Sequence, residues 1–125
     1  MPRDTFLREL QRLRDDILVL GSMVQEAIQE AVRALKARDL EMAKRIIHAD
    51  LEINRKRFKI EEDCLVLIAT QHPMAGDLRT IAAVLEIATD LERMGDYAKG
   101  ISRINLLLGP RPLLKPLIDI PRMAD

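Results

Sequence analysis

Residues 6–31 read FLRELQRLRDDILVLGSMVQEAIQEA, and the spacing of their apolar side chains decides the fold class. These side chains recur at alternating intervals of four and three residues: Phe6, Leu10, Leu13, Ile17, Leu20, Val24, Ala27 and Ala31. Such a heptad-like seam is typical of helices that pack nearly parallel to one another in a bundle. Basic residues complement the carbonyl end of a helix, so we expect this helix to end near Lys36 to Arg38.

A second helix with the same spacing follows Asp39, which is well placed to cap its first turn. Two of its seam positions, Asp50 and Arg57, are charged. One interpretation is a partly exposed edge of the seam, where these two side chains pair with each other. The other interpretation is a functional role for Asp50. The full seam comprises Ala43, Ile46, Asp50, Ile53, Arg57, Ile60, Cys64 and Leu67.

The sequence Gln71-His72-Pro73 breaks the second helix, because proline disfavours helical geometry in the residue before it. Pro73 is well placed to open a third helix that carries Asp77 near its positive end and runs to about Leu108. Short links between long helices make neighbours antiparallel. We therefore expect an all-α, up-down-up bundle of three long antiparallel helices over residues 1–108. Beyond a break at Gly109-Pro110, residues 118–121 resemble the start of a fourth helix.

Composition excludes several classes of protein. Lys and Arg together number 20, as do Asp and Glu, and only Phe6, Phe58 and Tyr97 are aromatic. A chain with no net charge and so few stacking side chains gives no case for nucleic-acid binding. The single Cys64 suits a reducing compartment, the N-terminus lacks a signal-peptide pattern, and no apolar run is long enough to cross a bilayer. We expect a soluble, cytoplasmic protein.

The third helix carries a broad apolar arc made of Val84, Ile87, Leu91, Met94, Gly95, Ala98 and Ile101. A glycine inside a helix costs about 1 kcal/mol relative to alanine. We therefore expect Gly95 to mark a close crossing with another helix.

Glu92 and Asp96 lie one helical turn apart at an edge of this arc. Like charges at this spacing destabilise a helix by a few tenths of a kcal/mol, so something should offset the repulsion. One possibility is local pairing, since Arg93 and Lys99 are each three residues from Asp96. The other is a metal ion, because two carboxylates one turn apart can share or bridge a cation.

Catalytic patterns are missing from the sequence. There is no Glu-x-x-His, no Gly-rich phosphate loop and no zinc-type grouping around His48 or His72, so we expect no enzyme. A histidine phosphotransfer module, with His48 as the phosphorylated residue, is an alternative among helical bundles. However, no Lys and Gly follow His48 at the offsets that such domains use. A structural helical oligomer without a ligand is a further alternative.

Several segments in combination resemble the PhoU family of bacterial phosphate-signalling regulators. The matching segments are residues 50–54, Gln71-His72-Pro73-Met74-Ala75-Gly76-Asp77-Leu78-Arg79, Asp90-Leu91-Glu92-Arg93-Met94-Gly95-Asp96, and Ala98. Residues 116–124 resemble the start of the family's second repeat. The resemblance implies that residues 109–125 are a linker and the beginning of a truncated second repeat.

The resemblance also implies a function and a metal motif. Family members are two tandem three-helix repeats, each with a Glu/Asp-x-x-x-Asp metal motif that corresponds here to Glu92 and Asp96. Asp77 and Asp50 are weaker candidate ligands, and Fe, Zn, Mn and Mg are all candidate metals. The family acts as a negative regulator that links a Pst-type phosphate ABC transporter, through its ATPase, to a phosphate-sensing histidine kinase, and it meets the membrane only through these partners. Because one repeat alone exposes apolar faces, we expect a homodimer that rebuilds six helices.

Overall fold

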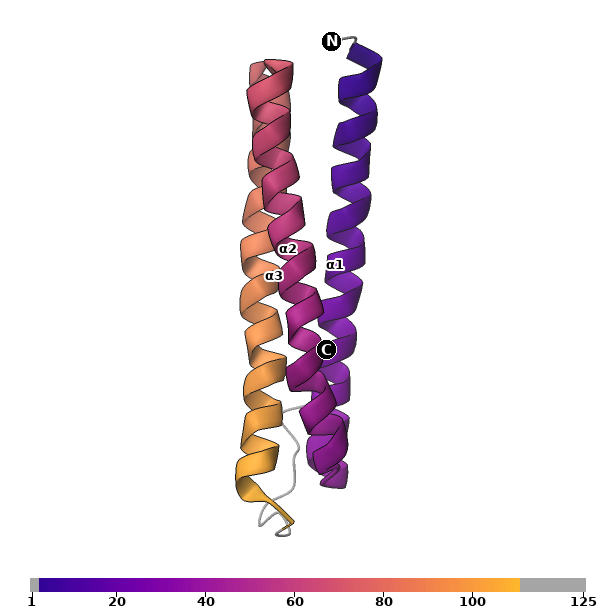
Figure 1. Cartoon of the computed structure of the whole chain (residues 1–125), viewed down its shortest axis with the longest axis vertical. Coiled ribbons are helices and arrows are strands. Elements are labelled where there is room, and N and C mark those ends of the chain that lie inside the picture. The colour runs from indigo at the N-terminus through magenta and orange to yellow at the C-terminus, as the bar shows by residue number, and fades with distance from the viewer. Residues whose placement is uncertain (1–2, 111–125) are drawn as a thin grey trace.

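The computed structural model describes residues 3–110, which form three long helices and no strand: α1 (Arg3–Ala37), α2 (Leu40–Gln71) and α3 (Ala75–Leu108). The helices stand side by side, with α1 and α3 running in one direction and α2 in the other (Figure 1), and each helix contacts both of the others. The expected all-α, up-down-up bundle is confirmed. Residues 111–125, where a second repeat is expected to begin, lie outside the described part of the chain.

The turn between α1 and α2 is a left-handed helix end followed at once by a new cap. Arg38 has a positive φ of 56°, its amide donates to the carbonyl of Leu35, and the amide of Asp39 donates to Ala34. This pair of bonds is the Schellman arrangement, which satisfies carbonyls that a helix end leaves open. The Asp39 carboxylate accepts from the amide of Met42 at 3.0 Å, which confirms the expected N-cap of α2.

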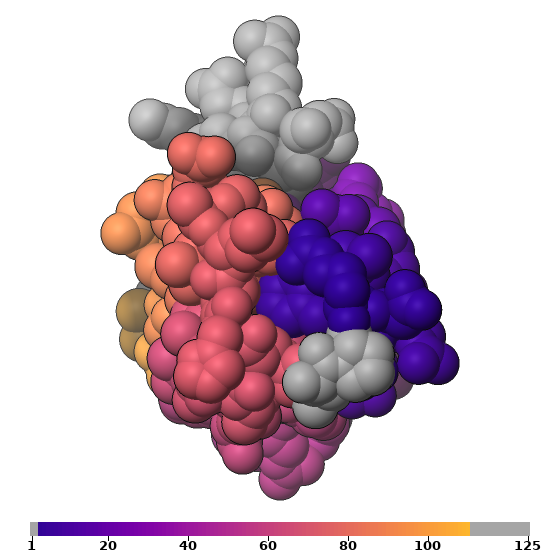
Figure 2. All heavy atoms as spheres, turned by 90° about the horizontal axis from the view of Figure 1, so that it is seen from above, coloured from indigo at the N-terminus to yellow at the C-terminus, as the bar shows by residue number. Residues whose placement is uncertain are grey.

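The turn between α2 and α3 begins at His72, which adopts the left-handed conformation with φ of 47°. The third helix starts at Ala75, two residues after the expected opening at Pro73, with Met74 as its N-cap. Asp77 accepts from the amide of Met74 at 3.2 Å, so it does lie at the positive end of α3. In the end-on view, the first turns of α1 pack directly against this turn (Figure 2).

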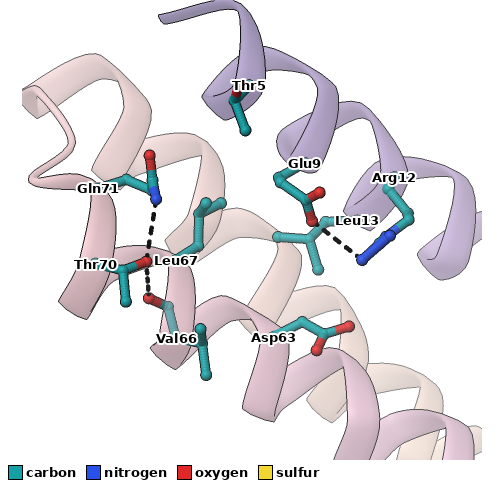
Figure 3. A pocket seen from close by; sticks show the side chains of 9 residues that line it. All are labelled: Thr5, Glu9, Arg12, Leu13, Asp63, Val66, Leu67, Thr70 and Gln71. Carbon is teal, nitrogen blue, oxygen red and sulfur yellow. Dashed lines mark hydrogen bonds and ion pairs between the residues drawn. The ribbon is translucent and has the colours of Figure 1, made fainter. Parts of the chain in front are cut away.

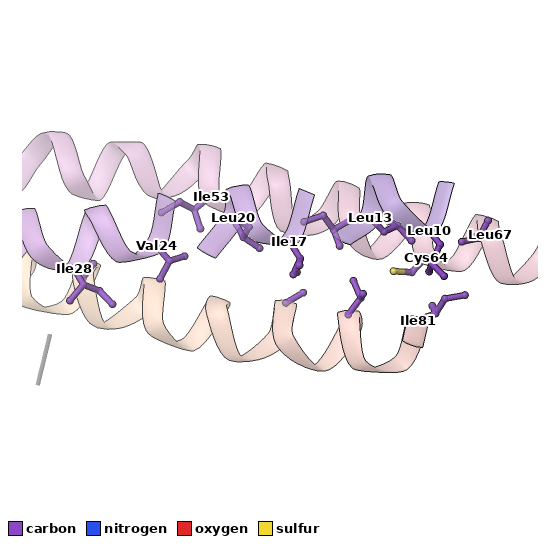
Figure 4. Close-up of a cluster of buried hydrophobic side chains, with 14 of the residues drawn as sticks. Leu10, Leu13, Ile17, Leu20, Val24, Ile28, Ile53, Cys64, Leu67 and Ile81 are labelled. Carbon is purple, nitrogen blue, oxygen red and sulfur yellow. The ribbon is translucent and has the colours of Figure 1, made fainter. Parts of the chain in front are cut away.

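The apolar seams of α1 and α2 face the interior, where Figure 4 shows their side chains between the three helices. All eight expected seam positions of α2 are buried. On α1, seven of the eight are buried, and Ile28 takes the place of the half-buried Ala27. The core is thus aliphatic, with Leu20, Val24 and Ile60 completely shielded from solvent.

The apolar arc expected on α3 is partly wrong. Ile87 and Met94 are 45% and 43% exposed, and Leu91 and Ile101 are only half-buried. The buried residues are Ile81, Val84, Ala88, Gly95, Ala98, Ser102 and Asn105. Small side chains dominate this stripe because they let α3 approach its neighbours closely, whereas the larger side chains of the arc remain outside.

Candidate functional site

The two charged seam residues of α2 are buried and do not pair with each other. Asp50 is 5% exposed and Arg57 is 9% exposed, and each reaches across to a partner on α3. The interpretation of a partly exposed seam edge with mutual pairing is therefore wrong. Asp50 and Arg57 lie two turns apart on one helix, whereas α3 places Lys99 beside Asp50 and Glu92 beside Arg57.

Asp50 is held by one hydrogen bond and one ion pair beside Gly95 of α3. Its Oδ2 accepts from Asn54 Nδ2 at 3.1 Å and lies 3.5 Å from Lys99 Nζ. A Cβ atom placed on Gly95 would lie 3.7 Å from Asp50 Oδ1 and 3.7 Å from Ile53 Cγ2. Gly95 is thus buried against α2, but these are ordinary van der Waals distances, so the expected close crossing that would require glycine is not found.

Arg57 lies between two carboxylates and an aromatic ring. Its Nη1 donates to Glu61 Oε1 at 2.9 Å, and its Nε lies 3.4 Å from Glu92 Oε2. The guanidinium carbon lies 4.2 Å from the centre of the Phe58 ring, a cation–π distance. The buried Nε makes no hydrogen bond within the described residues, so its contact with Glu92 is an ion pair only.

Glu92 and Asp96 have different surroundings. The Glu92 side chain is 38% exposed and pairs with Arg57, whereas Asp96 is exposed and no partner for it occurs within residues 3–110. Lys99, three residues from Asp96, pairs with Asp50 instead. Local neutralisation of Asp96 by Lys99 is therefore wrong. Asp96 borders an open hollow of ≈ 480 Å³ on the outer side of α3, together with Arg93, Tyr97 and Gly100.

Asp77 has a structural role at the far end of α3. Besides capping the helix, it accepts two hydrogen bonds from the guanidinium of Arg3, at 2.6 and 3.1 Å. These bonds, chiefly the one from Arg3, hold the pKa of the Asp77 carboxyl below its ordinary value. Fifteen residues of helix separate Asp77 from Glu92, about 22 Å at ~1.5 Å per residue. Asp77 therefore cannot bind the same metal ion as Glu92, Asp96 and Asp50.

The described residues alone do not fit a metal site with three or more protein ligands. Glu92 and Asp96 are one turn apart on α3, and Asp50 lies against this part of the helix. However, Glu92 already forms an ion pair with Arg57, and Asp50 forms one with Lys99. Within residues 3–110, no three His, Cys, Asp or Glu side chains gather closely enough to hold an ion. A cation at Glu92 and Asp96 needs further ligands from water or from another chain.

A second hollow lies between α1 and α2 near the start of the bundle (Figure 3). It measures ≈ 270 Å³, and several of the polar side chains that line it are paired with one another. Glu9 pairs with Arg12, Gln71 donates to Thr70, and Thr70 donates to the carbonyl of Val66. The side chains that line this hollow do not form a convergent set of polar groups suited to binding a molecule.

The remaining reactive side chains also give no catalytic arrangement. His48 is exposed on α2, and His72 forms the left-handed end of that helix. Cys64 is fully buried, and burial raises the pKa of its thiol to about 11. A buried thiol with so high a pKa is a poor nucleophile at neutral pH. None of the helices within residues 3–110 combines the length and the apolar character needed to cross a membrane.

The partners that α3 gives to Asp50 and Arg57 are not predicted by the spacing within α2 alone. The signal was available, because Glu92 and Lys99 are seven residues apart on α3, as Arg57 and Asp50 are on α2. Antiparallel packing pairs the two sets in reverse order. These pairs depend on the register between α2 and α3, which the sequence of either helix alone does not determine.

Comparison with known proteins gives a consistent family. Residues 17–104 match the PhoU domain. A phosphate-specific transport system accessory protein PhoU homolog from Aquifex aeolicus is 38% identical over 118 residues, covering 94% of this chain and 53% of that protein. The accessory protein PhoU of Escherichia coli is 35% identical over 101 residues, covering 81% of this chain and 42% of that protein.

A solved structure shares the fold. The crystal structure of the phosphate transport system regulatory protein PhoU from Streptococcus pneumoniae matches with a TM-score of 0.81 at 38% sequence identity. The match covers 88% of this chain and 52% of that one. This chain thus spans about half the length of the relatives that it matches.

Proposed function

The chain belongs to the PhoU family, and from this membership we propose that it is a non-enzymatic negative regulator of phosphate uptake and of phosphate-starvation signalling. In this proposal it is a cytoplasmic adaptor between a Pst-type phosphate ABC transporter and the phosphate-sensing histidine kinase. The observation that carries the proposal is the PhoU-domain match over residues 17–104, with relatives that are named accessory proteins of a phosphate-specific transport system.

The surface of α2 supports an adaptor that acts by contact. Leu51, Phe58 and Leu65 recur at intervals of seven residues and are 52%, 59% and 62% exposed. Residues seven apart lie on one helix face, and exposed apolar faces rimmed by charge are typical of protein-binding surfaces. We propose this α2 face, defined by Leu51, Phe58 and Leu65, as the contact for the transporter ATPase or the kinase.

Pull-down and a cellular assay test the adaptor together. The chain is used to capture the transporter ATPase and the sensor kinase of the organism that encodes it, and phosphate uptake and a phosphate-starvation reporter are followed in cells lacking the protein. We expect capture of at least one partner and restored repression in phosphate-rich medium. Phe58→Asp should abolish both, whereas Leu18→Asp, at an even more exposed apolar position on α1, should not. No capture and no repression by the unaltered chain would contradict the proposal.

Metal binding at Glu92 and Asp96 belongs to the same proposal, with the remaining ligands supplied by water or a second chain. Metal analysis of the purified protein tests it, with Glu92→Ala/Asp96→Ala as the variant and Glu86→Ala/Asp90→Ala as a matched acidic pair on α3. Fe, Zn, Mn and Mg are measured together. Loss of metal in the first variant alone supports the site, and equal content in all three proteins contradicts it.

A homodimer is the last part of the proposal. The relatives have about twice the length of this chain, and large apolar side chains of α3, outside the α2 face assigned to partner proteins, remain exposed. A second copy supplies the three further helices needed to cover such faces. Light scattering at micromolar concentration is expected to give twice the monomer mass; a monomer would remove this part of the proposal and leave a regulator that acts singly.

A further inference from the structure

The buried guanidinium of Arg57 has one nitrogen without a hydrogen bond, and that nitrogen lies beside the candidate metal ligand Glu92. Arg57 is 9% exposed, and its Nε has no hydrogen-bond partner within residues 3–110. Glu92 Oε2 lies 3.4 Å from this Nε. Buried polar atoms without a hydrogen bond are rare, and an ion pair without one is weaker than the bonds that arginine usually makes with carboxylates. The hold of Arg57 on Glu92 is therefore loose.

Arg57 is anchored independently of Glu92 by two residues of its own helix. Its Nη1 donates to Glu61 Oε1 at 2.9 Å, and its guanidinium carbon lies 4.2 Å from the centre of the Phe58 ring. These contacts give the guanidinium a counter-charge and a cation–π partner whether or not Glu92 is available. Loss of the Glu92 contact therefore does not leave Arg57 as an unpaired buried charge, which would be strongly destabilising.

The acidic pair on α3 is neutralised on one side only. Arg57 forms an ion pair with Glu92, whereas Asp96, one turn further along, is exposed and has no partner among the described residues. A divalent cation shared by Glu92 and Asp96 needs both carboxylates. A cation on either oxygen of Glu92 would also lie close to the buried guanidinium, where water and salt screen little of the repulsion between the two positive charges.

We propose that Arg57 is a built-in competitor of the metal ion at Glu92. In this chain the guanidinium stands in the place of the cation, and a divalent ion binds Glu92 and Asp96 only when Arg57 withdraws to Glu61. This inference concerns the regulation of the metal site in the proposed function and rests on that part of it. It also gives the reason why the described residues do not form a ready metal site. Arg57 lowers the affinity of the acidic pair for metal.

Calorimetric titration of the purified chain with Mn²⁺ tests the competition, with Arg57→Met as the variant. Methionine keeps an apolar stem at the buried position, and the side chains of Glu61 and Glu92 are 29% and 38% exposed, so neither carboxylate is left unsolvated. We expect Arg57→Met to bind Mn²⁺ at least about tenfold more tightly than the unaltered chain. Arg93→Met, which removes an exposed charge beside Glu92, should change the affinity by no more than about threefold.

The outcomes separate the competition from the metal site itself. Addition of Glu92→Ala and Asp96→Ala to Arg57→Met should abolish the gain in affinity. Metal binding by Arg57→Met but not by the unaltered chain supports the competition and refutes the metal site of the unaltered protein. Equal affinities of the two proteins overturn the competition and leave that metal site intact. Binding by neither protein overturns both, and an equal gain in Arg93→Met overturns the competition because it indicates a general charge effect.

Nuclear magnetic resonance of the unaltered chain follows Arg57 directly. Mg²⁺, which is diamagnetic, is added while the Arg57 Nε–H signal and the backbone amide signals of Glu92 and Asp96 are recorded. We expect the Arg57 signal to shift together with the two amide signals. Amide signals that shift while the Arg57 signal stays unchanged would overturn the proposal. Circular dichroism confirms that each variant keeps its helices, and Arg57→Gln repeats the Mn²⁺ titration with a polar side chain in case Arg57→Met does not fold.

Discussion

Asn105 offers the sharpest test of how the bundle is held together. Its side chain is fully buried near the end of α3. Its Nδ2 donates to the carbonyl of Ala34 at 3.1 Å and to that of Asp39 at 3.3 Å, and its Oδ1 accepts from the guanidinium of Arg38. One amide thus connects the end of α1, the cap of α2 and the last turns of α3.

The cost of Asn105→Ala follows from these contacts. Each neutral hydrogen bond contributes about 1 kcal/mol, and a bond to a charged group contributes about 2 kcal/mol. Alanine returns roughly 0.5 kcal/mol through its better helix propensity. We therefore expect the free energy of unfolding to fall by about 3 to 4 kcal/mol, a large fraction of the stability of an ordinary domain.

Ser102 supplies the matched control, because it is also fully buried on α3, one turn away. Its hydroxyl has no hydrogen-bond partner within the described residues. Ser102→Ala should therefore leave stability unchanged or raise it by about 0.5 kcal/mol. Urea unfolding followed by circular dichroism, at one fixed protein concentration, measures both variants.

A double variant shows whether Arg38 and Asn105 act together. Arg38→Ala removes the same hydrogen bond from Arg38 to Asn105. The stability losses of the two single variants should therefore sum to about 1 to 2 kcal/mol more than the loss measured for Arg38→Ala/Asn105→Ala. A loss of less than about 1 kcal/mol for Asn105→Ala, or an equal loss for Ser102→Ala, would refute this role of Asn105.

Three further predictions concern Gly95, Cys64 and Asp77. Gly95→Ala should change the free energy of unfolding by less than about 1 kcal/mol in urea titrations, because its Cβ makes only ordinary contacts, while Gly95→Val should cost more than about 2 kcal/mol by overpacking against Asp50 and Ile53. Cys64 should not react with a maleimide in the folded protein at neutral pH and should react fully in urea, as mass spectrometry would show; rapid labelling of the folded chain contradicts its burial. Asp77→Asn should lower the melting temperature at neutral pH. Because the pKa of Asp77 is lowered in the folded protein, its carboxylate stabilises the fold above the ordinary carboxyl pKa, and this stabilisation is lost as pH falls below about 4. The melting temperatures of the two proteins should therefore become equal in acid. A difference in melting temperature that does not depend on pH would refute the Arg3 contact.

Much of the fold follows from local patterns. The seam of α2 is buried at every expected position, and Asp39 caps that helix as its residue type predicts. The helix ends at Ala37 and Leu108 agree with the positions expected from Lys36 and Gly109. These features are predictable because heptad spacing and capping depend on residues within a turn or two of one another.

The inner face of α3 was not predictable in the same way. Ile87 and Met94 are as apolar as any core residue, yet they lie outside, while Ser102 and Asn105 lie fully inside. Two adjacent stripes on α3 both have heptad spacing, so periodicity alone does not choose between them. Close approach of α1 and α2 selects the stripe with small side chains.

In the candidate site, too, the positions of charges along each helix follow from the sequence, whereas their partners on other helices do not. The sequence by itself placed Glu92 and Asp96 one turn apart, and it identified Asp50 and Arg57 as charges within a seam. Only the tertiary structure decided that Arg57 pairs with Glu92, that Lys99 pairs with Asp50, and that Asp77 belongs to a helix cap. Spacing along one helix fixes which side chains share a face, but pairing between helices depends on their register, and that is set by packing along their whole length.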